Sequence, residues 1–153
     1  MRNSKRLITS LVILLCTTLG PIGTSSGADP ELSLTFAIDT SGSMRGDNIK
    51  EVRKSIVTVL ENLKGPVKYS VVSFSNKAKI EVSQSSRSED VIESIDSFKP
   101  AGRTALYDGL ISALRNTQNS QNSVIIVFSD GKDNSSSASA SEAKDGANSF
   151  VGM

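Results

Sequence analysis

Two apolar runs in this sequence end in loops that carry oxygen-bearing side chains. Residues 32–38 (LSLTFAI) favour a buried strand, and residues 123–128 (SVIIVF) form a continuous apolar run typical of a strand covered on both faces. Asp39 ends the first run, and Asp130 follows the second. Ligands of open α/β sheets bind beyond the carboxyl ends of the strands. The sequence therefore predicts an α/β fold with a ligand site at that edge.

The segments between these runs predict a layered domain. Apolar residues recur at helical spacing from Ile49 to Leu63, where Asp47 or Asn48 can cap the helix and Gly65-Pro66 can stop it. We further expect a strand over 67–75, a half-exposed antiparallel edge strand over 78–83, helices beginning at Ser88 and at Thr104, and a weak helix over 138–148. This order favours α/β layers around a mainly parallel sheet.

The first residues have the pattern of a secretory signal peptide. Arg2, Lys5 and Arg6 precede a mostly apolar stretch over 7–19, and Ser26-Gly27-Ala28 offers a cleavage site. A membrane anchor is the less favoured alternative, because the apolar core is shorter than about 20 residues. We therefore expect a signal peptide over 1–28, cleavage near Ala28, one domain over 29–153, and a secreted, periplasmic or otherwise extracytoplasmic protein.

Composition excludes several kinds of site. The chain has 17 Lys and Arg against 16 Asp and Glu, and three of the basic residues lie in the signal region, so bulk charge does not favour nucleic acid. With no histidine, neither a Ser-His-Asp triad nor a His-ligated zinc site can form. The single cysteine, Cys16, leaves with the signal peptide. Neither G-x-x-x-x-G-K-[ST] nor G-x-G-x-x-G occurs, which removes two common nucleotide sites.

The loop after residue 38 carries the strongest chemical signal. Asp39, Ser41 and Ser43 place one carboxylate and two hydroxyls at alternating positions. Such oxygen ligands suit a hard cation such as Mg²⁺. The simpler interpretation is a Ser- and Gly-rich turn, in which these side chains bond to nearby backbone groups.

The whole set of motifs resembles the von Willebrand factor type A domain with its metal-ion-dependent adhesion site. That site has three pieces: D-x-S-x-S after the first strand, matched by Asp39, Ser41 and Ser43; a threonine in a glycine-containing loop that opens a helix, matched by Thr104; and an aspartate after the fourth strand, matched by Asp130. The three pieces occur in order, each at an expected element boundary, and the resemblance covers roughly residues 32–148.

The resemblance implies both a ligand set and a function. The two serines would bind the metal directly, the threonine directly or through water, and the aspartates partly through water. We therefore expect Asp39, Ser41, Ser43, Thr104 and Asp130 to hold Mg²⁺, with Mn²⁺ or Ca²⁺ as alternatives. A protein ligand would supply an Asp or Glu carboxylate to the metal, so the resemblance implies a non-enzymatic adhesion module with no small-molecule substrate.

The sequence departs from that family at its C-terminal end. Full domains have six strands in the spatial order 3-2-1-4-5-6, in a doubly wound, Rossmann-like sheet with an antiparallel edge strand, whereas this chain supplies four and stops near where a fifth would begin. The strand at 123–128 is then expected to be an uncovered edge. Two interpretations of the missing strands are left open: the domain is truncated, or a partner completes the sheet.

Two alternatives to the adhesion module remain. Phosphatases of the haloacid dehalogenase type also place an aspartate after the first strand, which would make Asp39 a nucleophile, but Ser41 stands where those enzymes need a second aspartate as general acid. The other alternative is an inactive, truncated fragment. Asp108 and Asp133 are interpreted as a solvated helix face and a turn or cap rather than as ligands. Arg103 is interpreted as an ordinary exposed arginine, and the alternative is that it flanks the site and attracts an acidic partner.

Overall fold

The computed structural model describes residues 13–16, 31–117 and 122–151. From residue 31 onward the elements follow the predicted order of strand, helix, hairpin, two helices, strand and helix. Their bounds are β1 (Ile13–Cys16), β2 (Leu32–Asp39), the 3₁₀ turn η1 (Gly42–Met44), α1 (Asp47–Asn62), β3 (Val67–Phe74), β4 (Ala78–Ser85), α2 (Ser88–Asp96), α3 (Leu106–Thr117), β5 (Ser123–Phe128) and α4 (Ala140–Val151).

The strands form one mixed sheet in the order β1-β5-β2-β3-β4. Strand β2 pairs in parallel with both β3 and β5, while β4 pairs antiparallel with β3. The prediction of a mainly parallel sheet with an antiparallel edge strand is confirmed. The run β4-β3-β2-β5 also has the order 3-2-1-4 that the resemblance implied.

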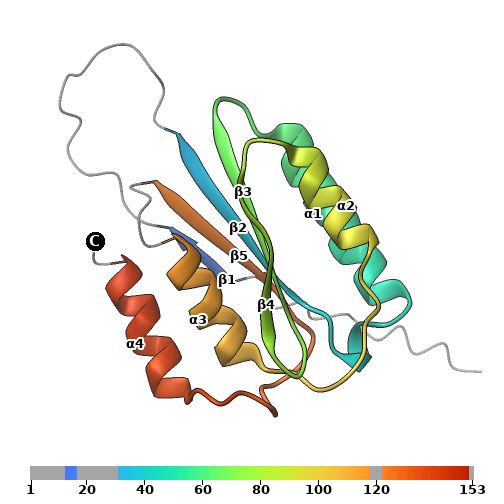
Figure 1. Cartoon of the computed structure of the whole chain (residues 1–153), viewed down its shortest axis with the longest axis vertical. Coiled ribbons are helices and arrows are strands. Elements are labelled where there is room, and N and C mark those ends of the chain that lie inside the picture. The colour runs from blue at the N-terminus through green and yellow to red at the C-terminus, as the bar shows by residue number, and fades with distance from the viewer. Residues whose placement is uncertain (1–12, 17–30, 118–121, 152–153) are drawn as a thin grey trace, which may run out of the picture.

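Helices cover both faces of this sheet (Figure 1). One apolar core packs α1 and α2 against one face and includes Phe36, Ile38 and Ile56. A second core packs α3 and α4 against the other face and includes Ala37, Phe74 and Phe150. Neighbouring residues of β2 thus point to opposite cores, as the twofold repeat of a strand requires. Because both faces are covered, Ser33 and Thr35 of β2 are buried along with its apolar residues.

The edge of the sheet beside β5 differs from the expectation. We expected an uncovered edge there, but residues 13–16 form β1 and pair antiparallel with β5, with Leu15 opposite Ile125. The prediction of an uncovered edge is therefore wrong for this structure, because unpaired backbone groups of an apolar strand accept another extended segment readily. Most of the predicted signal peptide, including the cleavage site near Ala28, lies outside the described residues.

Two element ends also differ from the sequence predictions. Helix α3 begins at Leu106, so Thr104 lies in the loop before it instead of opening the helix. The weak helix is found as α4, which extends to Val151. Among the described residues no strand follows β5, as expected of a chain that stops near where a fifth strand of the family would begin.

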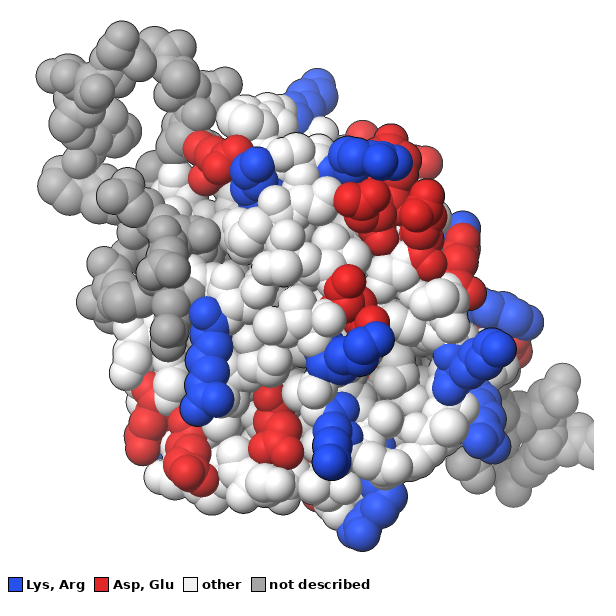
Figure 2. All heavy atoms as spheres, viewed as in Figure 1, with Lys and Arg blue, Asp and Glu red and all other residues white. Residues whose placement is uncertain are grey.

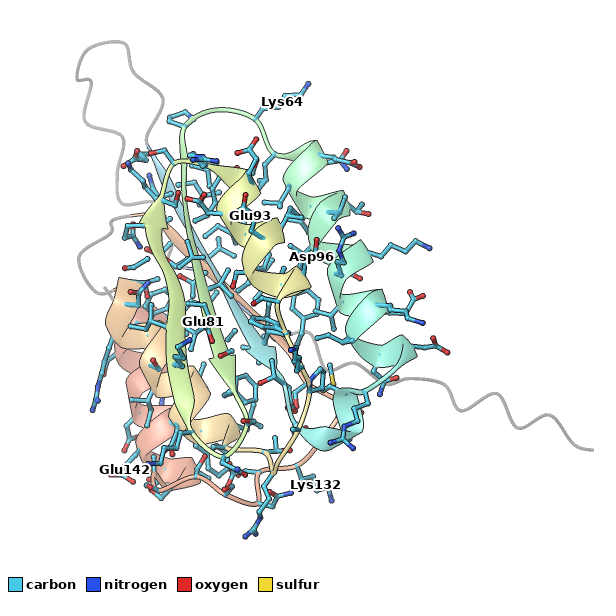
Figure 3. All side chains as sticks on the ribbon, turned by 45° about the vertical axis from the view of Figure 1, so that its right-hand side comes forward. Lys64, Glu81, Glu93, Asp96, Lys132 and Glu142 are labelled. Atoms are coloured by element: carbon cyan, nitrogen blue, oxygen red, sulfur yellow. The ribbon has the colours of Figure 1, made fainter. Side chains whose placement is uncertain are left out.

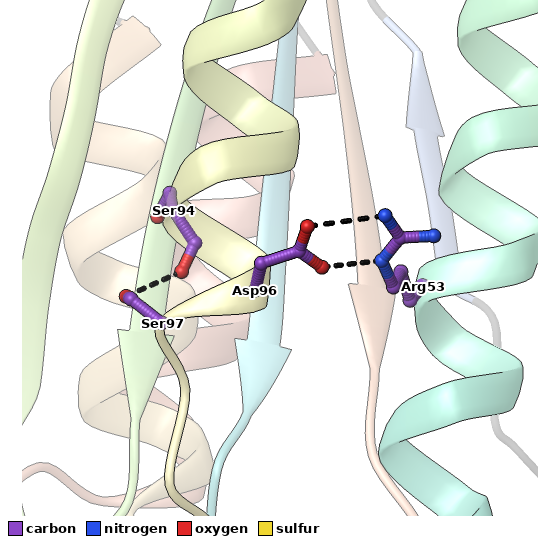
Figure 4. A network of polar contacts seen from close by, with 4 residues as sticks. All are labelled: Arg53, Ser94, Asp96 and Ser97. Carbon is purple, nitrogen blue, oxygen red and sulfur yellow. Dashed lines mark hydrogen bonds and ion pairs between the residues drawn. The ribbon is translucent and has the colours of Figure 1, made fainter.

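An ion pair joins α1 to α2 on the outside of one helical layer. Arg53 donates two hydrogen bonds to the carboxylate of Asp96, and the hydroxyl of Ser97 donates to the carbonyl of Ser94 at the end of α2 (Figure 4). The hydrogen bond from Arg53 lowers the pKa of Asp96. Both side chains are largely exposed, so the pair is expected to contribute little to stability.

The parallel strands bring several loops to one end of the molecule. Strands β2, β3 and β5 run in the same direction, so Asp39, Phe74 and Phe128 finish at the same edge. Helix α3 lies very close to β3, because a side-chain carbon at Gly109 would fall only 2.4 Å from the ring of Phe74. The N–H of Ala101 donates to the carbonyl of Thr40 at 2.8 Å, which places the loop before α3 beside the end of β2.

Candidate metal centre

The innermost residue of the candidate site is Asp39. Its side chain is completely buried at the end of β2. Its Oδ1 accepts the backbone N–H of Ser41 at 2.8 Å, and its Oδ2 accepts the hydroxyl of Ser129 at 2.7 Å. A buried carboxylate is costly unless it is hydrogen-bonded, so these two donors are what allows Asp39 to stay inside.

The two serines of the same loop lie beside Asp130. The hydroxyl oxygens of Ser41 and Ser43 are 3.1 Å apart, and Ser43 donates to Oδ1 of Asp130 at 2.8 Å. Ser41 is 2% exposed, whereas Ser43 is exposed. The chain of oxygens therefore runs from the buried end of β2 to the surface.

Thr104 adds a hydroxyl from a third loop. Its backbone is fixed by Asn134, whose side-chain oxygen accepts the Thr104 N–H at 2.9 Å and whose own N–H donates to the Thr104 carbonyl at 2.9 Å. A side-chain carbon at Gly131 would lie 3.2 Å from Oγ1 of Thr104 and 3.9 Å from Oδ2 of Asp39. Both oxygens therefore face the same glycine, and no hydrogen bond between described residues uses the Thr104 hydroxyl.

All five predicted site residues thus lie together at the carboxyl ends of β2 and β5. We call them the oxygen cluster: Asp39, Ser41, Ser43, Thr104 and Asp130. The candidate ligand atoms are all carboxylate or hydroxyl oxygens, which hard divalent cations prefer, and the Thr104 hydroxyl has no hydrogen-bond partner among the described residues. The described part of the chain holds no group of three or more His, Cys, Asp or Glu side chains placed for a metal ion. Hydroxyls would therefore make up most of the ligand set.

The sequence analysis missed three residues that support the cluster. The predicted helix cap at Asn48 is wrong, because Gly46 is the residue that precedes α1. The side-chain amide of Asn48 instead donates to Oδ2 of Asp130 at 2.7 Å and to the Ser43 carbonyl at 3.1 Å. Ser129 and Asn134 hold Asp39 and Thr104 as described above. The position of Ser129 next to Asp130 was a usable signal, whereas the contacts of Asn48 and Asn134 join segments far apart in sequence.

Asp108 and Asp133 belong to a second cluster nearby. The two carboxylate oxygens of Asp108 accept the backbone N–H groups of Ser137 and Ala138, each at 2.9 Å. Oδ1 of Asp133 accepts the hydroxyl of Ser136 at 2.5 Å. The interpretation of Asp108 as a solvated helix face is wrong, because its oxygens bind the loop that follows β5. We call Asp108, Asp133 and Ser136 the loop anchor.

Comparison with known proteins decides the family. The family model of the von Willebrand factor type A domain matches residues 33–151, which include the whole oxygen cluster. The chain belongs to this family. The resemblance that was first seen in the motifs at Asp39, Thr104 and Asp130 is thereby confirmed at the level of the domain.

Two curated relatives match about half of this von Willebrand factor type A chain. Inter-alpha-trypsin inhibitor heavy chain H4 of Sus scrofa is 30% identical over 86 residues, which are 54% of this chain and 9% of that protein. The uncharacterized protein sll0103 of Synechocystis sp. is 31% identical over 81 residues, 52% of this chain and 19% of that protein. The chain therefore spans only a small part of the length of these relatives.

Solved structures share the fold at low identity. Protein BatB of Bacteroides thetaiotaomicron has a TM-score of 0.65 and 19% identity, covering 80% of this chain and 63% of that one. The PilB minor pilin of Streptococcus sanguinis has a TM-score of 0.54 and 22% identity, covering 65% and 29%. The domain from the type V pilus tip protein Mfa5 of Porphyromonas gingivalis has a TM-score of 0.52 and 20% identity, covering 65% of this chain and 37% of that one. The fold is thus found in pilus proteins. In the described residues, no helix is both long and apolar enough to cross a membrane.

Proposed function

We propose that this chain is an exported, non-enzymatic interaction module that binds a protein ligand through a divalent cation, Mg²⁺ in the first place. The cation would be held by the oxygen cluster. The observation that carries this proposal is the convergence of hydroxyls and carboxylates from three separate loops on one point, around the buried Asp39. Export is supported by the signal-like first residues and by the pilus proteins among the structural neighbours.

The protein's own contribution would be to hold neutral oxygens in place. Ser41, Ser43 and Thr104 carry no charge, so they leave a divalent cation poorly neutralised and receptive to an added carboxylate. When bound, the cation would supply a Lewis-acidic position for an Asp or Glu of the ligand. Asp39 and Asp130 would orient the serine hydroxyls, as Asp130 already does for Ser43 at 2.8 Å.

The proposal is tested by calorimetric titration of the full chain with Mg²⁺ and with Mn²⁺, next to Ser41→Ala and a control variant, Ser139→Ala. Ser139 lies before α4, where its hydroxyl caps the helix outside the oxygen cluster. We expect saturable binding in the wild type and in Ser139→Ala, and binding at least about tenfold weaker in Ser41→Ala. Equal binding by all three proteins, or by none, would contradict the proposal.

A second assay separates this function from the phosphatase alternative. A chromogenic phosphate ester is added with Mg²⁺, and we expect no hydrolysis above that of Asp39→Asn. The position two residues after Asp39 holds Ser41, whose hydroxyl contacts Ser43, so the general acid of that enzyme class is replaced by an alcohol. Turnover that disappears in Asp39→Asn would favour the enzyme instead.

A further inference from the structure

Each of the three loops that form the oxygen cluster also carries a basic residue close to it. Arg45 follows Ser43 by two positions, Arg103 directly precedes Thr104, and Lys132 follows Asp130 by two positions. All three side chains are exposed. We call Arg45, Arg103 and Lys132 the basic rim.

Hydrogen bonds to backbone carbonyls hold the loops and the arginines of the basic rim beside the oxygen cluster. The loop of Arg45 lies against the loop of Arg103, since the N–H of Gly42 donates to the carbonyl of Gly102 at 3.0 Å. Arg45 Nε also donates to the carbonyl of Pro100 at 2.8 Å. The guanidinium of Arg103 donates to the carbonyl of Asn134, just beyond Lys132. These contacts hold the two arginines beside the cluster, and neither arginine has an ion-pair partner among the described residues.

The basic rim forms no ion pair among the described residues. Five ion pairs join carboxylates to other basic residues, and none of them, within the described ranges, includes Arg45, Arg103 or Lys132. Lys77 and Lys99, also exposed and outside these pairs, lie in loops at the same end of the sheet. Figure 2 shows Lys and Arg side chains gathered over the lower right of the molecule, and Figure 3 shows Lys132 pointing outward at the end opposite Lys64.

None of the carboxylates at this end forms an ion pair with the basic rim within the described ranges. Asp108 and Asp133 are used by the loop anchor, and Asp47 already pairs with Lys50. Asp39 is buried, and both oxygens of Asp130 accept hydrogen bonds from Ser43 and Asn48. A ligand that approaches the oxygen cluster therefore meets an exposed basic side chain from each of its three loops, and none of the three is ion-paired within the described ranges.

We infer that the basic rim selects a protein segment with several acidic residues in a row, not a single exposed carboxylate. The inference rests on the proposed function and adds to it. One carboxylate of such a segment would face the oxygen cluster, and its neighbours would pair with Arg103, Arg45 and Lys132. Arginine suits this role because its planar guanidinium can bind a carboxylate through two hydrogen bonds.

The basic rim has opposite effects on the two ligands of the site. Positive charge near the oxygen cluster repels a divalent cation and attracts an acidic peptide. Neutralising the rim should therefore weaken peptide binding and leave Mg²⁺ binding equal or tighter. If the basic rim only shaped the loops, its variants would bind both the peptide and Mg²⁺ more weakly. The direction of the change in Mg²⁺ affinity therefore distinguishes a role in recognition from a structural role.

The test measures binding of a fluorescent oligoglutamate peptide to the full chain in saturating Mg²⁺, with an oligoglutamine peptide of equal length as control. The variants are Arg103→Gln, Lys132→Gln and Arg45→Gln, singly and combined, with Lys64→Gln as a matched surface control. We expect each single rim variant to bind the oligoglutamate about two- to fivefold more weakly, and the combined variant more weakly still. Lys64→Gln should bind as the wild type does, and Arg103→Lys should retain most of the affinity.

The outcomes separate this inference from the proposed function. Mg²⁺ binding without any loss of oligoglutamate affinity in the combined variant overturns the basic rim and leaves the metal site standing. Rim-dependent peptide binding that is unchanged in EDTA supports the rim and contradicts the metal-mediated function. A sulfated polysaccharide that binds as tightly as the peptide, with the same dependence on the rim, overturns the assignment to an acidic protein segment.

Discussion

Two clusters of aspartate and serine lie at the same end of this molecule and use their oxygens differently. In the loop anchor, the carboxylate of Asp108 is occupied by two backbone N–H groups, and Asp133 accepts the hydroxyl of Ser136. In the oxygen cluster, the carboxylate of Asp130 accepts a serine hydroxyl and an amide, and Ser41 and Ser43 meet through their hydroxyls. The first cluster fixes a loop, whereas the second gathers side-chain oxygens from several loops.

The difference shows how a binding site can be told from a structural one when both contain the same residue types. Backbone N–H groups cannot be turned away without undoing the loop, so both carboxylate oxygens of Asp108 stay bound to Ser137 and Ala138. Hydroxyls rotate at little cost, so Ser41, Ser43 and Thr104 can exchange a partner within the protein for a cation. The predictions below test this contrast, beginning with the largest expected effect.

Asp39→Ala should have the largest effect, because it removes the buried carboxylate of the oxygen cluster. The N–H of Ser41 and the hydroxyl of Ser129 lose their acceptor, and each unsatisfied buried group costs about 1–3 kcal/mol. We expect a free energy of unfolding lower by about 2–4 kcal/mol and no response to Mg²⁺. Urea unfolding with EDTA and with Mg²⁺ measures both.

Asp39→Asn is the control for that variant. The amide can accept from Ser41 and contact Ser129 while carrying no charge, so stability should fall far less while the Mg²⁺ response is still lost. A strong Mg²⁺ response in Asp39→Asn would mean that the charge of this residue does not matter to the site.

Asp108→Ala should lower stability without changing the metal response. It frees the N–H groups of Ser137 and Ala138, at a cost of about 1–2 kcal/mol because both are partly exposed. The gain in unfolding temperature on adding Mg²⁺ should equal that of the wild type. If that gain is lost, the loop anchor acts on the metal and the contrast between the clusters fails.

Ser43→Ala and Ser136→Ala form a matched pair, one hydroxyl from each cluster. Ser43 bridges Ser41 and Asp130, and Ser136 bonds Asp133. We expect the Mg²⁺ dissociation constant to rise about tenfold in Ser43→Ala and to stay unchanged in Ser136→Ala. Calorimetry of the two variants side by side checks this, and equal effects would count against the distinction.

The smallest effect concerns pH and the helix that follows the loop anchor. Hydrogen bonds from the backbone N–H and the hydroxyl of Ser139 lower the pKa of Glu142 at the start of α4. Since the folded-state pKa lies below the unfolded value, this contribution is fully present above the usual carboxyl range near pH ~4.3 and is lost as pH falls through the folded pKa. The unfolding temperature of Glu142→Gln should therefore fall slightly less on acidification than that of the wild type. An identical pH profile would show that the cap adds nothing.

Much of this architecture could be predicted from sequence because it depends on local patterns. The apolar runs at 32–38 and 123–128 are strands, and the helical spacing after Ile49 gave α1. Four residues of the oxygen cluster follow strand ends, which parallel strands necessarily bring together, whereas Thr104 was assigned from the family resemblance. Their proximity followed from topology, while metal binding itself stays a prediction.

The remaining features depend on contacts between distant segments. Asn48 reaches Asp130 across 82 residues, and no local rule distinguishes that role from a helix cap. Residues 13–16 match an export signal by composition, yet pair with β5 because an apolar extended segment satisfies an open strand edge. Asp108 was misread for the same reason, since its partners lie 29 and 30 residues away.

The most direct test of the central claim is thermal unfolding of the full chain during titration with Mg²⁺, for the wild type, Asp39→Asn and Asp108→Ala together. A ligand that binds only the folded state stabilises it by about 2.7 kcal/mol at a hundredfold excess over Kd. We predict equal increases in unfolding temperature for the wild type and Asp108→Ala, and none for Asp39→Asn. A wild type that does not respond to Mg²⁺, or an Asp39→Asn variant that responds as fully, would contradict the account.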